Sequence, residues 1–595
     1  MVGTFAAALL VTGASVALGR AALALCGARR WSWAAPGVGL GLLLALCWGT
    51  VRLPGGGATA ALAVAALAVA SLAAGRGRAA GGGEALRRGV PVALAALAVA
   101  SLPFWVEGHF GVLGTGLNPD MSQHLLAAER LAQGHASQLE AQGYPLGPHA
   151  AVVALREGLG IGPVQGFSGL TLALAALAAL CSLGWLGRLA APARVGAALL
   201  VALPYAVASY LAQGAFKELA MALFLLAFVL CLREADRAWA GRSTRLLPAA
   251  LLAAGALYAY SFPALLWLGA AGALWAVGPG ARERLRGAGR AALAFAVLVA
   301  PELGRMDDFR RFETFDPDGP GLGNLFGQLS PLEALGIWPS GDFRLAPGDG
   351  AVPAVAFYAG AALALALLAL GARRCARAGE RALLAGLGAA ALAYLAARLG
   401  GTAYTAAKAI EVAAPLATLT IIAPLFARTP LATPTGAVEV GAVERDEPQP
   451  RGVERVALAL FGLAAGACSL LALVNAPVGP TTYSPALAEM RTLVSGDPTL
   501  VLAPLRLLDE QHGLRYLAWE LRGGRVCIAA ESAAGEAPPR GVRFVIAPEG
   551  AGPPYPGLRL RRAAPPYALW EVPGPHAPRS PCPLIEVRQE RQRSP

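Results

Sequence analysis

The sequence predicts a polytopic α-helical membrane protein with about 14 transmembrane helices and a small C-terminal extracytoplasmic α/β domain. Of the 595 residues, 56% are hydrophobic and only 14% are charged. The mean hydropathy of +0.54 is far above that of soluble domains. Many windows, such as 351–371, are almost purely apolar. A helix of about 20 such residues crosses the hydrocarbon core with its backbone amides satisfied internally.

The individual spans follow from the length of the apolar stretches. They are expected at 5–26, 33–51, 58–75, 89–106, 166–187, 195–212, 216–232, 246–261, 263–278, 290–303, 351–371, 381–398, 403–427 and 456–475. The stretch "YAYSFPALLW" either separates two spans or kinks one, because proline interrupts helical hydrogen bonding. The first span lacks a cleavage site and is expected to be retained. Residues 1–475 thus form the predicted transmembrane domain.

Arginine-rich connections set the orientation, because cytoplasmic loops retain positive charge. Those at 27–31, 75–88, 187–194, 233–245, 281–290 and 372–381 fall on one side of the membrane together with the loop 428–455. The long loops 107–165 and 304–350 fall on the other side. We therefore expect a multi-pass protein of the plasma membrane with both termini outside. This topology explains the net charge of +12 without a nucleic-acid partner.

The tail, residues 476–595, is expected to form the extracytoplasmic domain. Strands are predicted at 499–504, 525–530 and 541–549, and a helix at 505–522. The Pro- and Arg-rich end is predicted to be disordered. Cys527 and Cys582 lie in this external tail, and their spacing alone leaves a disulfide open.

Lysine is scarce, since Lys217 and Lys408 are the only two among 49 basic residues. Both are predicted near the external end of a span, with Glu218 adjacent to one and Glu411 on the helical face of the other. A lysine near a helix end often reaches toward the lipid headgroups and needs no further role. Ionisable residues within the membrane more often mark a substrate or ion path, and two lysines beside acids favour a functional site.

The stretch "LNPDMSQHLL", residues 117–126, concentrates polar chemistry in the first external loop. Asn118 suits the N-cap, Pro119 the first helical position and Asp120 the first turn. The same loop holds four of the six histidines: His109, His124, His135 and His149.

The helix that begins there is expected to be amphipathic and to lie on the outer membrane surface. Asp120, Gln123 and His124 would share the polar face, while Met121, Leu125 and Leu131 would face lipid. Helix capping alone also explains Asn118 and Asp120, so a catalytic role for Asp120 stays open at this point.

These features resemble the GT-C superfamily of membrane glycosyltransferases. "NPDMSQH" followed by "YPLGPH" (144–149) is similar to the long first external loop of that superfamily, which carries an acidic residue. "LSPLEALGIWPSGDFR" (329–344) and the external C-terminal domain are similar to members from actinobacteria that assemble cell-envelope glycans. In many relatives the acidic loop follows the first span, whereas here it follows the fourth.

The resemblance implies transfer of a sugar from a polyprenyl-phosphate donor to an extracytoplasmic acceptor, a cell-envelope glycan or glycolipid. Asp120 would act as catalytic base or orient the acceptor hydroxyl, and His124 would hold Asp120 or contact phosphate. The anionic phosphate requires cations at the outer interface, for which the candidates are Lys217, Lys408 and Arg344.

Further candidates are assigned to the acceptor and the transferred sugar: Tyr144, His149, Glu218, Trp338, Asp342 and Glu411. The Trp338 ring would stack on a sugar, although an interfacial or buried role is commoner for tryptophan. Asp307 and Asp308 would bind a divalent cation together with Asp120. No organic cofactor is expected; the partners are the lipid-linked sugar, the acceptor and membrane lipids.

A multi-span transporter or lipid flippase is the main alternative. Transporters place their sites near the midplane, between repeats with broken helices. Here the polar residues gather outside and the loops are long, which favours the transferase. A ligase or polymerase that uses a diphosphate-linked glycan and a non-catalytic assembly protein are further alternatives.

Overall fold

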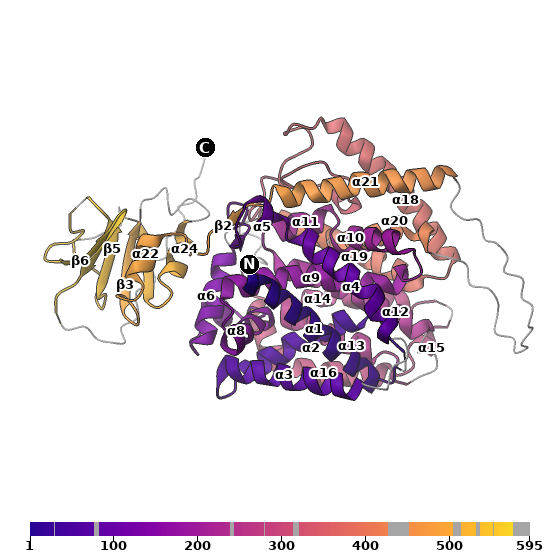
Figure 1. The fold of residues 1–595 in the computed structure, drawn as a ribbon, viewed down its shortest axis with the longest axis horizontal. Helices are drawn as coiled ribbons and strands as arrows, with labels where there is room; N and C mark the ends of the chain where they lie inside the picture. The colour runs from indigo at the N-terminus through magenta and orange to yellow at the C-terminus, as the bar shows by residue number, and fades with distance from the viewer. Residues whose placement is uncertain are drawn as a thin grey trace, which may run out of the picture.

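The structure is a computed structural model of the chain. It describes residues 1–574 apart from 29, 76–81, 119, 238–242, 279, 313–320, 427–451, 504–512, 531–535 and 551. Cys582, most of the predicted loop 428–455 and the predicted disordered end lie outside the described residues. The chain forms a large helical body and, at one end of it, a small sheet domain (Figure 1).

Helices account for all of the predicted spans. In the first half of the body they are α1 (Val2–Leu25), α2 (Ala35–Val51), α3 (Gly56–Gly75), α4 (Gly82–Ala100), α5 (Leu102–Val106), α6 (Asp120–Ala132), α7 (Gln138–Ala141), α8 (Gly147–Leu159), α9 (Pro163–Leu186), α10 (Ala191–Ala202), α11 (Tyr205–Ala212) and α12 (Phe216–Arg237). In the second half they are α13 (Leu247–Tyr260), α14 (Ala264–Ala276), α15 (Ala281–Arg284), α16 (Ala288–Val299), η1 (Ala300–Glu302), α17 (Leu303–Phe309), η3 (Pro331–Leu335), α18 (Ala354–Arg377), α19 (Arg381–Gly400), α20 (Ala403–Ile421), η4 (Ala423–Leu425) and α21 (Gly452–Val474).

By length and composition, seven helices of the described chain are able to cross a membrane, or eight if one bent pair counts as a single span. α2, α13 and α14 are apolar but shorter. The chain is therefore a multi-pass membrane protein, whereas the count of fourteen spans and their orientation stay predictions.

Two of the predicted spans are shaped by proline. α10 and α11 meet at an angle of 61°, because Pro204 interrupts the helical hydrogen bonds between them. "YAYSFPALLW" separates two helices rather than kinking one: α13 ends before Ser261, which has a φ of 59°, and Pro263 precedes α14.

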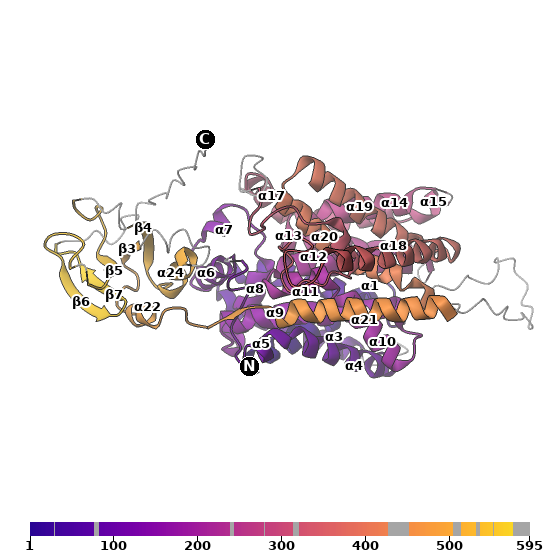
Figure 2. The same ribbon diagram turned by 90° about the horizontal axis from the view of Figure 1, so that it is seen from above.

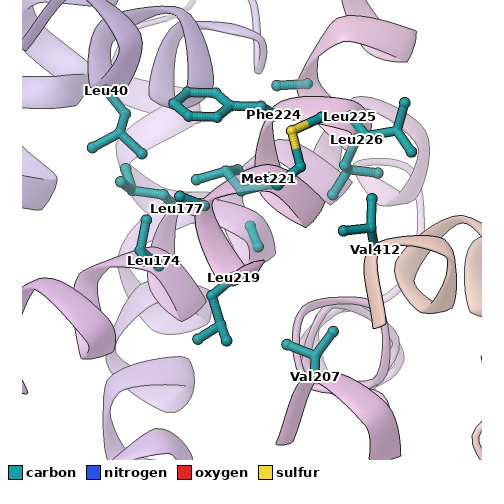
Figure 3. Close-up of a cluster of buried hydrophobic side chains, with 14 of the residues drawn as sticks. Leu40, Leu174, Leu177, Val207, Leu219, Met221, Phe224, Leu225, Leu226 and Val412 are labelled. Carbon is teal, nitrogen blue, oxygen red and sulfur yellow. The ribbon is translucent and has the colours of Figure 1, made fainter. Parts of the chain in front are cut away.

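The core of the body is built around α9, α12 and α20. Leucine, phenylalanine and methionine side chains from these helices interdigitate with those of α2 and α11 (Figure 3). Small residues let other helices approach more closely: a Cβ atom on Gly39 would lie 1.7 Å from the Ser15 carbonyl oxygen, so α1 and α2 touch backbone to backbone. Close packing of this kind fixes the helices that position the polar residues described below.

The C-terminal domain contains a five-stranded sheet in the order β4-β3-β5-β7-β6. β3 (Pro498–Ala503), β4 (Arg525–Ala530) and β5 (Phe544–Pro548) are parallel and confirm the three predicted strands. β6 (Arg559–Ala564) and β7 (Tyr567–Glu571), which the sequence analysis did not predict, add an antiparallel edge. Helices α22 (Pro485–Met490) and α24 (Gly513–Glu520) complete the domain, and α24 confirms part of the predicted helix.

The domain joins the body beside the first long loop. β2 (Val478–Gly479) follows α21 and pairs antiparallel with β1 (Val112–Leu113) of that loop. Both views place α24 next to α6, with the sheet beyond them (Figures 1 and 2). The sheet domain and the Asp120 helix therefore lie at the same end of the molecule, while the domain boundary at 475–476 stays a prediction.

Candidate active site

The helix α6 spans Asp120–Ala132, so Asp120 lies in its first turn, as the capping residues predict. Pro119, the predicted first helical residue, lies outside the described residues. The Asp120 backbone N–H donates a 2.9 Å hydrogen bond to Oδ1 of Asn118, which satisfies an amide at the helix start. Asp120 itself is half-buried. The prediction that Met121 and Leu125 face lipid is wrong, because both are buried in the protein core, where α8, α9 and α24 pack against α6.

His124, one turn after Asp120, contacts a second histidine. Its Nδ1 atom lies 3.1 Å from Nε2 of His149 on α8. The ring of Phe216 packs edge-on against the His124 ring. His149 is fully buried, and its other ring nitrogen has no partner among the described residues. Burial, together with the nearby charge of Arg305, lowers the pKa of His149 to about 3. His149 is therefore a neutral member of a buried pair.

Lys217 lies at the start of α12, with its Nζ atom 4.0 Å from the centre of the Tyr144 ring. This contact is a cation–π interaction, which favours the ammonium ion. Arg305 of α17 fixes the tyrosine from the other side, since its guanidinium donates to the Tyr144 carbonyl oxygen. Arg305 is in turn paired with Glu302 at 3.3 Å. The two long loops, 107–165 and 304–350, therefore meet at Tyr144, whose ring contacts Lys217.

Lys408 of α20 is paired with Glu218, the neighbour of Lys217. The distance from Lys408 Nζ to Glu218 Oε1 is 2.9 Å, and the Tyr404 ring lies 4.3 Å from the same nitrogen. Glu411, one turn further along α20, is fully buried, and neither of its carboxyl oxygens has a partner among the described residues. The ion pair brings both lysines to the first turn of α12.

Asp120 lies in the same region, because its negative charge interacts with the positive charge of Lys217. The second loop also reaches the start of α6: Nδ2 of Asn324 donates to the Leu117 carbonyl oxygen at 2.9 Å and to Oε1 of Gln213 at 2.8 Å. Three segments that are distant in sequence are therefore held together around Asp120, Lys217 and Lys408. We call these three residues and Glu218 the polar cluster.

Other predicted site residues lie elsewhere. Arg344 is held by Asp342 through a 2.6 Å contact, so each neutralises the other. Trp338 is fully buried against Phe357, which contradicts its assignment to a sugar platform. The acceptor assignments of Tyr144, His149, Glu218 and Glu411 also need revision, because all four side chains are buried in this conformation.

Two of the three predicted metal ligands are exposed. Asp307 is exposed and pairs with Arg310 at 3.2 Å, and Asp308 is exposed as well. Within the described ranges, no group of three or more His, Cys, Asp or Glu side chains is arranged to hold a metal ion. The contribution of Asp307, Asp308 and Asp120 to one cation site therefore stays a prediction.

The sequence analysis missed Asn324, Gln213 and Arg305. Scarcity, the signal that identified the two lysines, also applies to Asn324, because the chain has only three asparagines. Arginine is too common in this chain for Arg305 to be recognised in that way. A cleft of about 630 Å³ lies away from the cluster, between the start of α1 and the loop before α9, and is lined by residues such as Leu10, Leu159 and Gln165.

No protein-family model matches the chain, and no curated protein matches it. Eight chains of solved structures match, among them two of the arabinofuranosyltransferase AftD from Mycobacteria. The first is 15% identical with a TM-score of 0.49 and covers 82% of this chain and 40% of that chain. The second, a mutant of AftD, is 14% identical with a TM-score of 0.51 and covers 82% of this chain and 42% of that chain.

The chain thus spans about two-fifths of the length of AftD. At this identity the likeness concerns the fold alone.

Proposed function

We propose that this protein is a membrane glycosyltransferase of the GT-C type, which moves a sugar from a polyprenyl-phosphate donor to an acceptor outside the cytoplasm. The observation that carries the proposal is the polar cluster, in which two lysines meet at the start of α12 within electrostatic reach of Asp120. A shared fold alone does not define an activity, so the site carries the argument.

The donor phosphate would bind at the first turn of α12. Lys217 and Lys408 supply positive charge, and the free backbone N–H groups of a helix N-terminus favour an anion. Glu218 holds Lys408 in place in this state. A phosphate would compete with Glu218 for the Lys408 ammonium, which makes this ion pair the contact expected to change on donor binding. Arg344 is not part of this proposal, because Asp342 neutralises it.

Asp120 would accept the proton of the acceptor hydroxyl. The acceptor oxygen then bonds to the anomeric carbon of the sugar while the bond from that carbon to the phosphate oxygen breaks. The pair of electrons leaves with the polyprenyl phosphate, whose added negative charge the two lysines would stabilise. The proton remains on Asp120 until the product departs. His124 and His149 would help to hold α6 against α8 and would not take part in proton transfer.

The geometry is also consistent with the proposed placement in a plasma membrane with the site outside. Helix α6, which carries Asp120, and the C-terminal domain lie toward one end of the molecule (Figure 2). The arginine-rich connections would then lie in the cytoplasm.

The test is sugar transfer by the full chain in lipid nanodiscs, with synthetic polyprenyl-phosphate arabinofuranose and polyprenyl-phosphate mannose as donors and an alkyl arabinofuranoside as acceptor. We expect product with one of these donors, and a fall of about 10²–10⁴-fold in kcat for Asp120→Asn. Gln123→Glu is the matched control, since it changes a polar residue of the same helix. Wild-type turnover by Asp120→Asn would exclude Asp120 as the base.

A further inference from the structure

The C-terminal domain makes contacts with the loop that carries Asp120. β1 and β2 pair just before that loop turns into α6. Beyond this pairing, the Thr115 hydroxyl is hydrogen-bonded to the Tyr483 hydroxyl, and the Tyr483 ring stacks on Tyr516 with centroids 3.7 Å apart. Thr115 lies five residues before Asp120, so the domain is connected to the start of the helix through two aromatic rings.

A second set of contacts lies at the other end of α6. The Arg130 side chain donates to the Gly524 carbonyl oxygen at 3.1 Å. Arg522 lies 3.9 Å from Glu129, a buried carboxylate that also pairs with Arg156 of α8. α24 and its C-terminal turn, which carries Arg522, therefore pack against α6 (Figures 1 and 2).

The side chains of α24 confirm this packing. Tyr516 and Trp519 are buried, and they belong to the hydrophobic core of the helical body rather than to the two apolar clusters that flank the sheet. α24 therefore forms part of the wall that supports α6, although it lies nearly 400 residues away in the sequence.

The Tyr516 hydroxyl is buried at this junction. Burial raises the pKa of Tyr516, while hydrogen bonds with Tyr483 and Thr115 lower it. The hydroxyl therefore belongs to the same network of side chains that joins the domain to the loop before α6.

We infer that the C-terminal domain is a positioning element of the active site: Arg522 fixes the end of α6, and Tyr516 holds the loop before Asp120 through Tyr483 and Thr115. The inference rests on the proposed function where it gives Asp120 a chemical role. The support of α6 by α24 is a structural statement and is tested without any substrate.

The first experiment measures hydrogen–deuterium exchange of the full chain in lipid nanodiscs. Arg522→Met should increase the exchange rate of the backbone amides of residues 126–132 by roughly threefold to tenfold, because the Glu129 contact is lost. Arg522→Lys, which retains the charge, should restore part of the protection. Arg562→Met is the matched control, since Arg562 belongs to the same domain but pairs with exposed Glu489. Equal exchange in Arg522→Met and Arg562→Met would overturn the inference.

The second experiment measures kcat and KM in the transfer assay. Tyr516→Phe keeps the ring stack and removes the hydroxyl from its network with Tyr483 and Thr115, so kcat should fall roughly tenfold while the KM for the donor stays the same. Tyr567→Phe, in β7 of the same domain, should behave as the wild type. An unchanged kcat for Tyr516→Phe would remove the hydroxyl from the positioning of Asp120. If Asp120→Asn were fully active while Arg522→Met still loosened α6, the proposed function would fail and the structural support would stand.

Discussion

The Lys408 ammonium lies 2.9 Å from the Glu218 carboxylate, and both side chains are largely buried between α12 and α20. The pair joins a helix from the first half of the body to one from the second half, and it brings Lys408 next to Lys217. Two lysines separated by almost 200 residues in sequence thereby belong to one cluster, together with the carboxylates of Glu218 and Asp120.

We expect this ion pair to be important for stability. Glu218→Gln leaves the Lys408 charge buried without its partner and should lower the free energy of unfolding by about 3–5 kcal/mol. The double variant Glu218→Gln/Lys408→Met should recover most of that loss. Thermal unfolding in detergent measures both effects. Glu84→Gln, which breaks an exposed pair with Arg88, is the control and should change stability by less than about 1 kcal/mol. Equal melting temperatures for Glu218→Gln and Glu84→Gln would contradict the expectation.

Lys217 is expected to require a lysine rather than any cation. Lys217→Arg keeps the charge, but its planar guanidinium is larger than the ammonium that sits 4.0 Å from the Tyr144 ring. We expect the KM for the lipid-phosphate donor to rise by about tenfold with Lys217→Arg and by more with Lys217→Met. Steady-state kinetics at fixed acceptor concentration measures this. Arg374→Lys, in the pair with Glu454 at the other side of the body, is the control. An unchanged KM in Lys217→Met would remove Lys217 from the donor site.

Asn324 is expected to hold the loop in front of Asp120. Asn324→Ala removes the two hydrogen bonds to Leu117 and Gln213 and leaves their buried oxygen atoms unpaired, which should cost about 1–3 kcal/mol of stability. Transfer activity should fall with it, because the start of α6 is less well fixed. Asn475→Ala is the matched control, since Asn475 is exposed and bonds only to a helix carbonyl. The two variants are compared by their melting temperatures and by kcat. Identical values for both variants would show that Asn324 does not fix the loop before Asp120.

His149 makes stability depend on pH. Its pKa in the folded protein is about 3, well below the value of about 6.5 for an unfolded histidine, so the unfolded state binds more protons between these values. Stability should therefore fall as pH is lowered below about 6.5, by up to roughly 1.4 kcal/mol per pH unit. His149→Phe should flatten this dependence in unfolding experiments between pH 4.5 and 7.5, whereas His135→Phe, at an exposed loop position, should not. Parallel pH curves for His149→Phe and the wild type would refute the prediction.

The sequence by itself determined the class of fold. Apolar length located the helices of the body, because a backbone in hydrocarbon has few ways to satisfy its amides. Short apolar runs predicted β3, β4 and β5. Capping chemistry located the first residue of α6, since Asn118 and Asp120 act within a few residues of each other and need no tertiary information.

The scarcity of lysine singled out Lys217 and Lys408, but it did not predict which side chains they contact. The pairing of Lys408 with Glu218 depends on how α12 packs against α20, and local spacing pointed instead to Glu411. The sequence also did not predict the burial of Met121, Trp338 and His149. An amphipathic pattern does not distinguish a helix face that contacts lipid from one that packs inside a helical bundle.

The role of the C-terminal domain was decided by tertiary structure alone. Nothing in the sequence around Tyr516 or Arg522 indicates that α24 packs on a helix almost 400 residues earlier. Local sequence encodes which residues form helices and strands, because capping, periodicity and apolar length act over a few turns. Which charged groups meet is set by long-range packing of those elements, and in this protein that packing brings together Asp120, the two lysines and the domain that supports them.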